Sequence, residues 1–271
     1  MQGTGWTQAV VLALLVLPGA AALTSGSAPV APTSSALFHS GPFQANVSNY
    51  NWAGYAVTGP VHSVSFVQGS WIQPNATCAG SLLQYSSFWV GIDGFTSSTV
   101  EQTGTEADCH PGTASYYSWY EFYPAAAVRM TTVPVHPGDL IKASVTYVNA
   151  TVGFTTTLTD TTTGKSASHS SPVTNAKRTS AEWVAEAPSS LLSVLPLADF
   201  GKAKFGKDYT GLGSTCEATI SGTTGVIGSF AASSIQKLNM VALTGTTWMA
   251  TTTALTPNGT SFVVTWRSAG P

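Results

Sequence analysis

Hydrophobic and polar residues alternate with a period of two along most of the chain after Asn46. The clearest stretches are short, rich in β-branched and aromatic residues, and separated by turn sequences such as HPGD and TTTGK; they cover 63–72, 86–93, 116–123, 140–148, 152–160 and 261–266. This alternation is typical of strands with one buried face. No segment has a convincing amphipathic helical pattern. Many short strands without intervening helices predict an all-β, antiparallel β-sandwich or barrel with little helix.

The same period assigns polar side chains to shared surfaces, because residues two apart in a strand lie on one face. The sets expected to share a face are Gln102, Gly104 and Glu106; Trp119, Glu121 and Tyr123; and, if SAEWVAEAP is extended, Glu182, Val184 and Glu186. Of the 12 acidic residues, five lie between Asp93 and Glu121. A purely structural sandwich has little reason to concentrate its acids in this way.

The N-terminal region predicts a domain boundary. An apolar run from Ala9 to about Leu17, followed by small residues, is typical of a signal peptide, although no Lys or Arg precedes it. We expect the signal peptide to span 1–22, with cleavage as late as residue 28, and the protein to be secreted. Residues 23–45 are rich in Ser, Pro and Ala and predict a linker or short pro-segment. The folded domain should therefore span 46–271.

The composition narrows the classes of partner. Charged residues make up 8% of the chain, against roughly a quarter in an average protein. The formal net charge of -2 leaves no basic patch for nucleic acid. No second apolar span follows the N-terminal run, so we expect no stable membrane association after signal removal. Few ion pairs and few cations favour tolerance of acid. We expect a monomer without a cofactor.

Three cysteines agree with an oxidising compartment. We expect a Cys78–Cys109 disulfide, because it would join two loops that flank the acid-rich segment. Cys216 is then left over and is expected to be buried and free. Only the Cys109-His110 pair comes near a metal-ligand spacing, so we expect no metal site.

Common hydrolase signatures are absent from the sequence: it has no G-x-S-x-G, no H-E-x-x-H and no pair of D-[TS]-G loops. Six other blocks occur in order: NYNWAGYAV (49–57), FWVGIDG (88–94), VEQTGTE (100–106), SWYEFYP (118–124), AEWVAEAP (181–188) and LADFG (197–201). Together they resemble the glutamic peptidases, or eqolisins, a family of acid endopeptidases. The resemblance implies two large, packed, strongly curved antiparallel sheets of concanavalin-like or jelly-roll type. It also implies that the concave face binds a polypeptide in a cleft.

The resemblance further implies a catalytic pair. Its glutamine matches Gln102 in the Q-T-G block, and its glutamate matches Glu186, the second acid of the A-E-W-x-x-E block. The other matched residues, expected to bind substrate or support the pair, are Trp52, Trp89, Asp93, Glu121 and Tyr123. Glu106 stands where the family often has an aspartate, so we expect a carboxyl network with altered geometry.

These residues suit peptide hydrolysis in acid. Glu186 can take a proton from water and return it to the leaving amine, while Gln102 holds the water and donates an amide N–H to the oxyanion. An amide does not titrate in acid, whereas a histidine base would already be protonated. Asp93, Glu106 and Glu121 are expected to tune the pKa of Glu186 and to carry protons in acid.

Two other functions fit parts of the pattern. One is a carbohydrate-binding or adhesive β-sandwich with aromatic stacking platforms at Trp52, Trp89, Trp119 and Tyr123. The other is a glycosidase with two catalytic carboxylates, such as Glu121 and Glu186. The glycosidase hypothesis gives Gln102 no necessary role, so this residue discriminates it from the peptidase hypothesis.

Overall fold

The computed structural model describes residues 45–78, 82–190 and 193–270. The signal peptide expected at 1–22 lies outside these residues. So does the expected linker or pro-segment at 23–45, except for Ala45, where the first strand begins.

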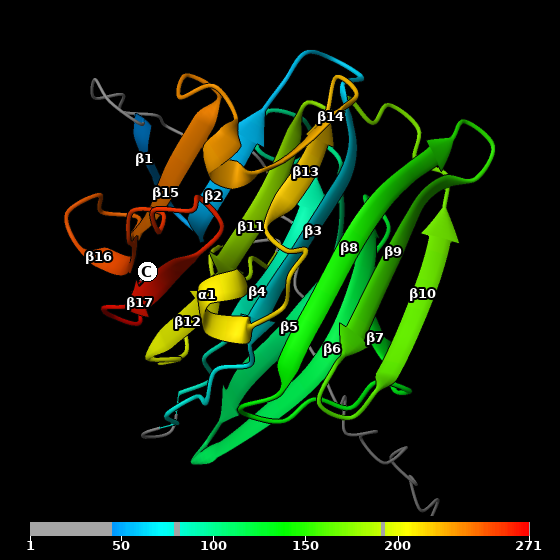
Figure 1. Cartoon of the computed structure of the whole chain (residues 1–271). Helices are drawn as coiled ribbons and strands as arrows, with labels where there is room; N and C mark the ends of the chain where they lie inside the picture. Colours follow the sequence, from blue (N-terminus) through cyan, green and yellow to red (C-terminus); the bar gives the residue numbers. More distant parts are fainter. Residues whose placement is uncertain (1–44, 79–81, 191–192, 271) are drawn as a thin grey trace, which may run out of the picture.

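The all-β prediction is confirmed (Figure 1). In the described ranges, helix is confined to α1 (Lys207–Thr210) and the short 3-10 helix η1 (Ile227–Ser229). No helix in these ranges has the length and apolar character needed to cross a lipid bilayer.

The strands form a first sheet that carries the acid-rich segments. Its spatial order is β1 (Ala45–Asn49), β15 (Ile235–Val241), β2 (Trp52–Thr58), β11 (Ser180–Glu186), β4 (Ser87–Ile92), β5 (Val100–His110), β6 (Thr113–Tyr123) and β7 (Val128–Met130). All neighbours in this order are antiparallel except β1 and β15, which are parallel. The purely antiparallel expectation therefore misses one pair.

A second sheet packs against the first (Figure 1). Its order is β16 (Trp248–Thr252), β17 (Phe262–Trp266), β12 (Lys202–Phe205), β3 (Val64–Ile72), β8 (Leu140–Asn149), β9 (Gly153–Asp160) and β10 (Lys165–Ser171). The hairpin of β13 (Glu217–Ile220) and β14 (Thr223–Val226) pairs with β3. Strand β16 also pairs with β15, so the two sheets are joined at one edge.

The main apolar core lies between the sheets. Trp183 from the first sheet and Trp71, Phe205 and Phe262 from the second are all fully buried there. The Trp183 indole N–H donates to the backbone oxygen of Gln68 at 2.8 Å, so the buried polar atom of this side chain is satisfied. Burial of each such side chain contributes about 1.5–3 kcal/mol to folding.

The first sheet also buries its other face. A second apolar cluster there contains Trp52, Trp89, Trp119 and Val184. An antiparallel sheet in a two-layer sandwich ordinarily leaves its outward face to water. In this protein the apolar cluster covers that face, so residues 100–109 of β5 are all buried, although most of them are polar. The acid-rich segment is thus enclosed on both sides.

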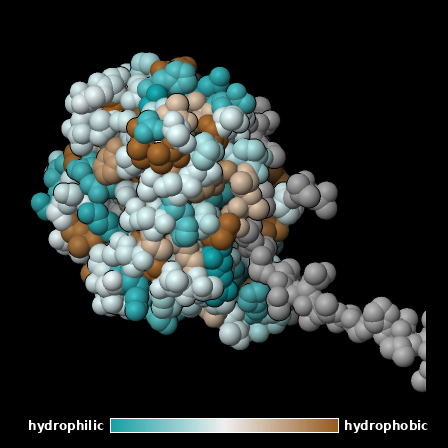
Figure 2. Space-filling model, turned by 90° about the vertical axis from the view of Figure 1, so that its right-hand side faces the viewer, coloured by the Kyte–Doolittle hydropathy of each residue, from teal (hydrophilic) through white to brown (hydrophobic). Residues whose placement is uncertain are grey.

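The outward face of the second sheet is different. Thr155, Thr157 and Thr159 of β9 each hydrogen-bond to the serine opposite on β10, with O···O distances of 2.8 Å. Figure 2 shows the molecule from the side on which β9 and β10 lie in Figure 1, and pale and teal residues dominate it. This agrees with a surface coated by hydroxyl groups rather than by ions.

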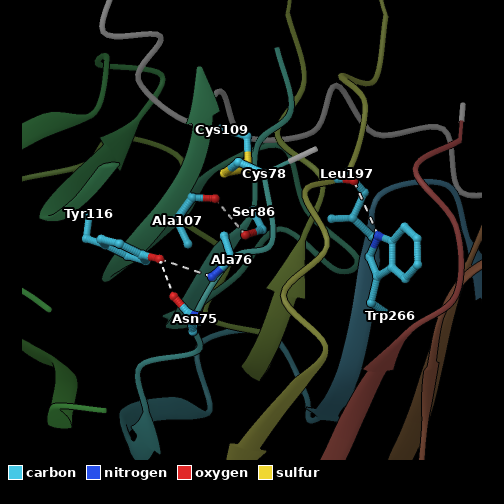
Figure 3. Close-up of a disulfide and its surroundings, with 9 residues drawn as sticks. All are labelled: Asn75, Ala76, Cys78, Ser86, Ala107, Cys109, Tyr116, Leu197 and Trp266. Atoms are coloured by element: carbon cyan, nitrogen blue, oxygen red, sulfur yellow. Dashed lines mark hydrogen bonds between the residues drawn. A yellow bond between two sulfur atoms is a disulfide. The ribbon is translucent and has the colours of Figure 1, made fainter. Parts of the chain in front are cut away.

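The expected disulfide is confirmed: Cys78 is bonded to Cys109 near the end of β5 (Figure 3). Beside it, the backbone N–H of Ala76 donates to the hydroxyl oxygen of Tyr116 at 3.1 Å, which ties the same segment to β6. Cys216 is buried and free, as expected. The disulfide therefore fixes β5 at the end that is farther from Gln102.

Candidate active site

Strand register places three rows of side chains on the outward face of the first sheet, which we call the site face. The rows run across β2, β11, β4, β5 and β6 and contain Trp52, Glu186, Ser87, Glu106 and Tyr117; Gly54, Val184, Trp89, Gly104 and Trp119; and Ala56, Glu182, Gly91, Gln102 and Glu121. Gln102 and Glu186 thus lie on one face of one sheet, on strands separated only by β4. The side chains share this face, as predicted, because residues two apart along a strand point to the same side of the sheet.

Glu186 is held by neutral hydrogen-bond donors. The Trp89 indole N–H donates to Oε2 at 2.7 Å, and the Asn51 Nδ2 donates to Oε1 at 3.1 Å. Burial raises the pKa of Glu186 to about 8, while the indoles of Trp89 and Trp52 oppose the rise. The nearby charge of Glu121 raises this pKa further, and Asn51 lowers it. Among the described residues the Trp52 indole N–H has no hydrogen-bond partner of normal geometry, so it lowers the pKa of Glu186 less than Trp89 does.

Gln102 donates from Nε2 to Oε2 of Glu121. Burial raises the pKa of Glu121 to about 8, and this hydrogen bond lowers it. The Oε1 atom of Gln102 is buried and has no hydrogen-bond partner among the described residues. A buried acceptor left unpaired costs about 1–3 kcal/mol, so such atoms need an explanation.

Two glycines let Trp89 lie between the members of the pair. A Cβ at Gly91 would stand 2.9 Å from Cζ3 of Trp89 and 3.2 Å from Cβ of Gln102. A Cβ at Gly104 would stand 2.6 Å from Cβ of Trp89. The Trp89 indole therefore extends from beside Gly91, which is paired with Gln102, to its hydrogen bond with Glu186. Only glycine at positions 91 and 104 leaves space for this side chain.

Glu106 extends the carboxyl network. Its pKa is raised well above the usual range by burial, by Asp108 and by Glu186. Burial also raises the pKa of Asp108 to about 7, although the Arg129 guanidinium nearby lowers it. The raised pKa values favour the protonated forms of Glu106 and Asp108 at acidic pH.

Asp93 has a different place. Its carboxylate accepts hydrogen bonds from the backbone N–H groups of Arg178 at 2.6 Å and Thr179 at 2.9 Å. It fixes the connection that leads into β11. Burial raises the pKa values of Glu101 and Glu182, and the nearby Asp93 raises both further. The structure does not bring it into contact with the proposed pair.

The aromatic residues enclose the site face. Trp52 and Trp89 pack edge to face, with ring centroids 4.8 Å apart. Tyr123 is partly buried against the same cluster. Gln102 is 0% and Glu186 1% exposed, so the open groove expected at this face is closed at both side chains.

In the part of the chain that the structure describes, no three His, Cys, Asp or Glu side chains are grouped as metal ligands would be.

Comparison with known proteins identifies the family. The model of the peptidase A4 family matches residues 50–264. The chain belongs to the peptidase A4 family. The family predicted from the six sequence blocks is thereby confirmed.

Two curated relatives of this A4 chain are fungal. It is 35% identical over 143 residues to Aspergillopepsin-2 from Aspergillus niger, covering 51% of this chain and 48% of the relative. It is 33% identical over 140 residues to Scytalidopepsin B from Scytalidium lignicola, covering 50% of this chain and 51% of the relative. The chain spans about half the length of the curated relatives it matches.

The A4 fold is also seen in a solved structure. A crystal structure of scytalido-glutamic peptidase with a peptide-based transition-state analog aligns with a TM-score of 0.64 and 23% identity, covering 81% of this chain and 99% of the other. This likeness supports the curved β-sandwich predicted from the sequence.

One residue beside Glu186 was missed by sequence reasoning. Asn51 lies in the NYNWAGYAV block, but nothing in the local pattern shows that it contacts Glu186. The two residues are 135 positions apart. Only the register of β2 against β11, which places Trp52 opposite Glu186, could have indicated the contact.

Proposed function

We propose that the chain is a secreted, acid-active endopeptidase in which Gln102 and Glu186 act together on one water molecule. The observation that carries this proposal is their placement on one enclosed face with connected partners. Gln102 is hydrogen-bonded to Glu121, whose carboxyl group interacts electrostatically with Glu186. Trp89 lies beside Gly91, the residue paired with Gln102, and donates a hydrogen bond to Glu186.

The chemistry needs one proton acceptor and one fixed donor. Ionised Glu186 accepts a proton from water as the water oxygen bonds to the peptide carbonyl carbon. The carbonyl oxygen becomes an oxyanion, which the amide N–H of Gln102 stabilises. Glu186 then returns the proton to the amide nitrogen as the C–N bond breaks. The products are a carboxylic acid and an amine, and Glu186 is ionised again.

The protonation of the site links it to acid. In the closed conformation the pKa of Glu186 is about 8, with burial as the largest cause. Opening of the site face to admit water and substrate reduces that burial and lowers the pKa toward the acidic range. Burial likewise raises the pKa values of Glu106 and Glu121, so both are neutral in acid before the site face opens. At higher pH their ionisation adds like charges beside Glu186 and opposes its function.

A polypeptide substrate is supported by the relatives. A peptide-based transition-state analog occupies the scytalido-glutamic peptidase structure that shares this fold. Because Gln102 and Glu186 are buried, a peptide reaches them only when the site face opens.

The carbohydrate-binding alternative fits the structure less well. A stacking platform must present an aromatic ring to solvent. Trp52, Trp89 and Trp119 are at most 1% exposed. Their packing instead encloses the carboxyl network, and shielding from bulk water strengthens electrostatic interactions at a catalytic site.

The test is cleavage of a denatured protein by the purified chain from about pH 2 to 7, a range that brackets ordinary carboxyl pKa values. We expect cleavage in acid that chelators, serine-protease reagents and pepstatin-type inhibitors do not block. Glu186→Gln should be inactive at every pH. The matched control is Glu217→Gln, which alters a glutamate on the opposite outward face and should retain activity. Cleavage by Glu186→Gln would assign the base to Glu182 or Glu121.

A further inference from the structure

A tight turn between β1 and β2 presents Asn51 to the site face. The Asn49 side-chain oxygen accepts hydrogen bonds from the backbone N–H groups of Asn51 at 2.9 Å and Trp52 at 3.0 Å. Asparagine side chains commonly stabilise turns through such bonds to backbone groups two or three residues on. The conformation of Asn51 is therefore set by its own turn.

Asn51 also binds β11 at two points. Its backbone oxygen accepts from the N–H of Ala187 at 2.8 Å, directly after Glu186. Its side-chain Nδ2 donates to Oε1 of Glu186 at 3.1 Å, and the residue is 5% exposed. Backbone and side chain together fix Asn51 relative to the proposed base.

This arrangement restricts the orientation of the Glu186 carboxylate. The terminal torsion of a glutamate side chain is broad, so packing alone does not fix the plane of its carboxyl group. Asn51 holds one oxygen, and Trp89 holds the other at 2.7 Å. Each carboxylate oxygen can accept more than one hydrogen bond, so both keep capacity for a water molecule.

We propose that Asn51 is a positioning residue, which fixes the plane of the Glu186 carboxylate so that an oxygen lone pair faces the attacking water. The inference rests on the proposed function of Glu186 and adds a residue to it. An amide suits this role in acid, because it donates without carrying a charge and does not titrate there.

The charged groups around Glu186 make a neutral donor important. Glu121 from β6 and Glu106 from β5 face it and interact with it electrostatically. Asp108 and Arg129 lie farther along the network and act on Glu106 and Asp108, respectively. The partners of Glu186 from β2, β4 and the turn are Trp52, Trp89 and Asn51, which are uncharged. Loss of the Asn51 donor therefore removes support from the ionised Glu186 carboxylate, which has only acidic side chains and uncharged partners around it.

The experiment compares kcat and KM from pH 2 to 7 for wild type, Asn51→Leu and a matched control, Asn239→Leu. Asn239 lies in the same sheet and accepts a hydrogen bond from the backbone N–H of Thr252 at 2.8 Å. Asn51→Leu should lower kcat by at least about tenfold, as expected for a lost hydrogen bond to a charged group. The acidic limb of its kcat–pH profile, where kcat rises with pH, should lie about one pH unit higher than in wild type, since one unit is tenfold in ionised fraction. KM should change little, and Asn239→Leu should affect thermal stability without moving the limb.

A conservative variant keeps the test decisive if Asn51→Leu does not fold. Asn51→Asp keeps the shape of the side chain and can donate through its protonated hydroxyl at the lowest pH. Its activity relative to wild type should fall as the introduced carboxyl group ionises above about pH 4, because the ionised group no longer donates and repels Glu186. A ratio that stays constant across pH would overturn the proposal.

A second readout separates this inference from the proposed function. The titration of the Glu186 carboxyl is followed by carbon NMR, with Glu186→Gln used to assign its signal. The pKa of Glu186 should be higher in Asn51→Leu than in wild type even if no form cleaves peptides. Absence of peptidase activity would defeat the proposed function alone. An unchanged Glu186 titration and an unchanged kcat profile in folded Asn51→Leu would overturn the role of Asn51.

Discussion

The molecule has a hydrogen-bonded glutamine–glutamate pair on each outward face. Gln102 donates to Glu121 on the first sheet, and Gln68 donates to Glu217 on the second. The chemical groups are the same, but their surroundings differ. Both glutamines are buried, but Glu121 is 2% exposed whereas Glu217 is only partly buried, and the side-chain oxygen of Gln102 has no partner among the described residues. A hydrogen-bonded pair of this kind is therefore not a site by itself.

The Gln102–Glu121 pair differs from the Gln68–Glu217 pair because a second carboxyl group, that of Glu186, lies beside it. Glu121 interacts electrostatically with Glu186, and burial raises the pKa of each to about 8. Burying acids together is unfavourable unless they stay protonated or gain donors. Such an arrangement is typical of functional sites, where perturbed acids concentrate. Enclosure and a neighbouring acid, rather than the amide–carboxyl contact, therefore distinguish the site face.

The largest expected difference between the two pairs is in rate. Gln102→Ala should lower kcat by about 10²–10³-fold, the usual loss for an oxyanion donor. Gln68→Ala removes the equivalent amide from the other face and should leave kcat within about twofold. Steady-state kinetics on a peptide substrate at acidic pH measure both. Equal losses in the two variants would remove the distinction between the faces.

A smaller difference is expected in the pH dependence of stability. In the unfolded chain Glu121 loses its proton near its ordinary pKa of 4.5, whereas the folded protein retains it to about 8. The folded state therefore binds more protons between these values, and the free energy of unfolding falls as pH rises through this window. Glu121→Gln should make that fall shallower, and Glu217→Gln should not. Urea unfolding at pH 4, 6 and 8 is the measurement; equal stability of wild type at pH 4 and 8 would contradict the account.

Much of the fold could be predicted because several strands carry strong local patterns. The aromatic and β-branched alternation of β4 and β6 marks them clearly, and the sharing of faces follows from it. The short strands β12 and β13 have only 4 residues each, too few for a period of two to be distinctive. The parallel pairing of β1 with β15 depends on contacts between distant segments, which a local pattern does not contain.

The candidate site, like the fold, could be predicted from the sequence only where local pattern determines it. The family blocks named Gln102 and Glu186, and strand periodicity placed their neighbours on the same face. The partners of Asp93 were not foreseen, because its backbone φ of 71° turns the chain at the end of β4 and directs its carboxylate to the connection before β11. The contact of Asn51 with Glu186 depends on sheet register. The closure of the site face is a property of packing that short blocks do not specify.

The most direct test of the central claim is a double-mutant cycle on kcat/KM with Gln102→Ala and Glu186→Gln. If the two side chains act on one water molecule, each loss disables the same step, and the effects should not multiply. We predict that the double variant is no more than a few-fold slower than the slower single variant. A double variant whose loss equals the product of the two single losses would show independent action and contradict the account.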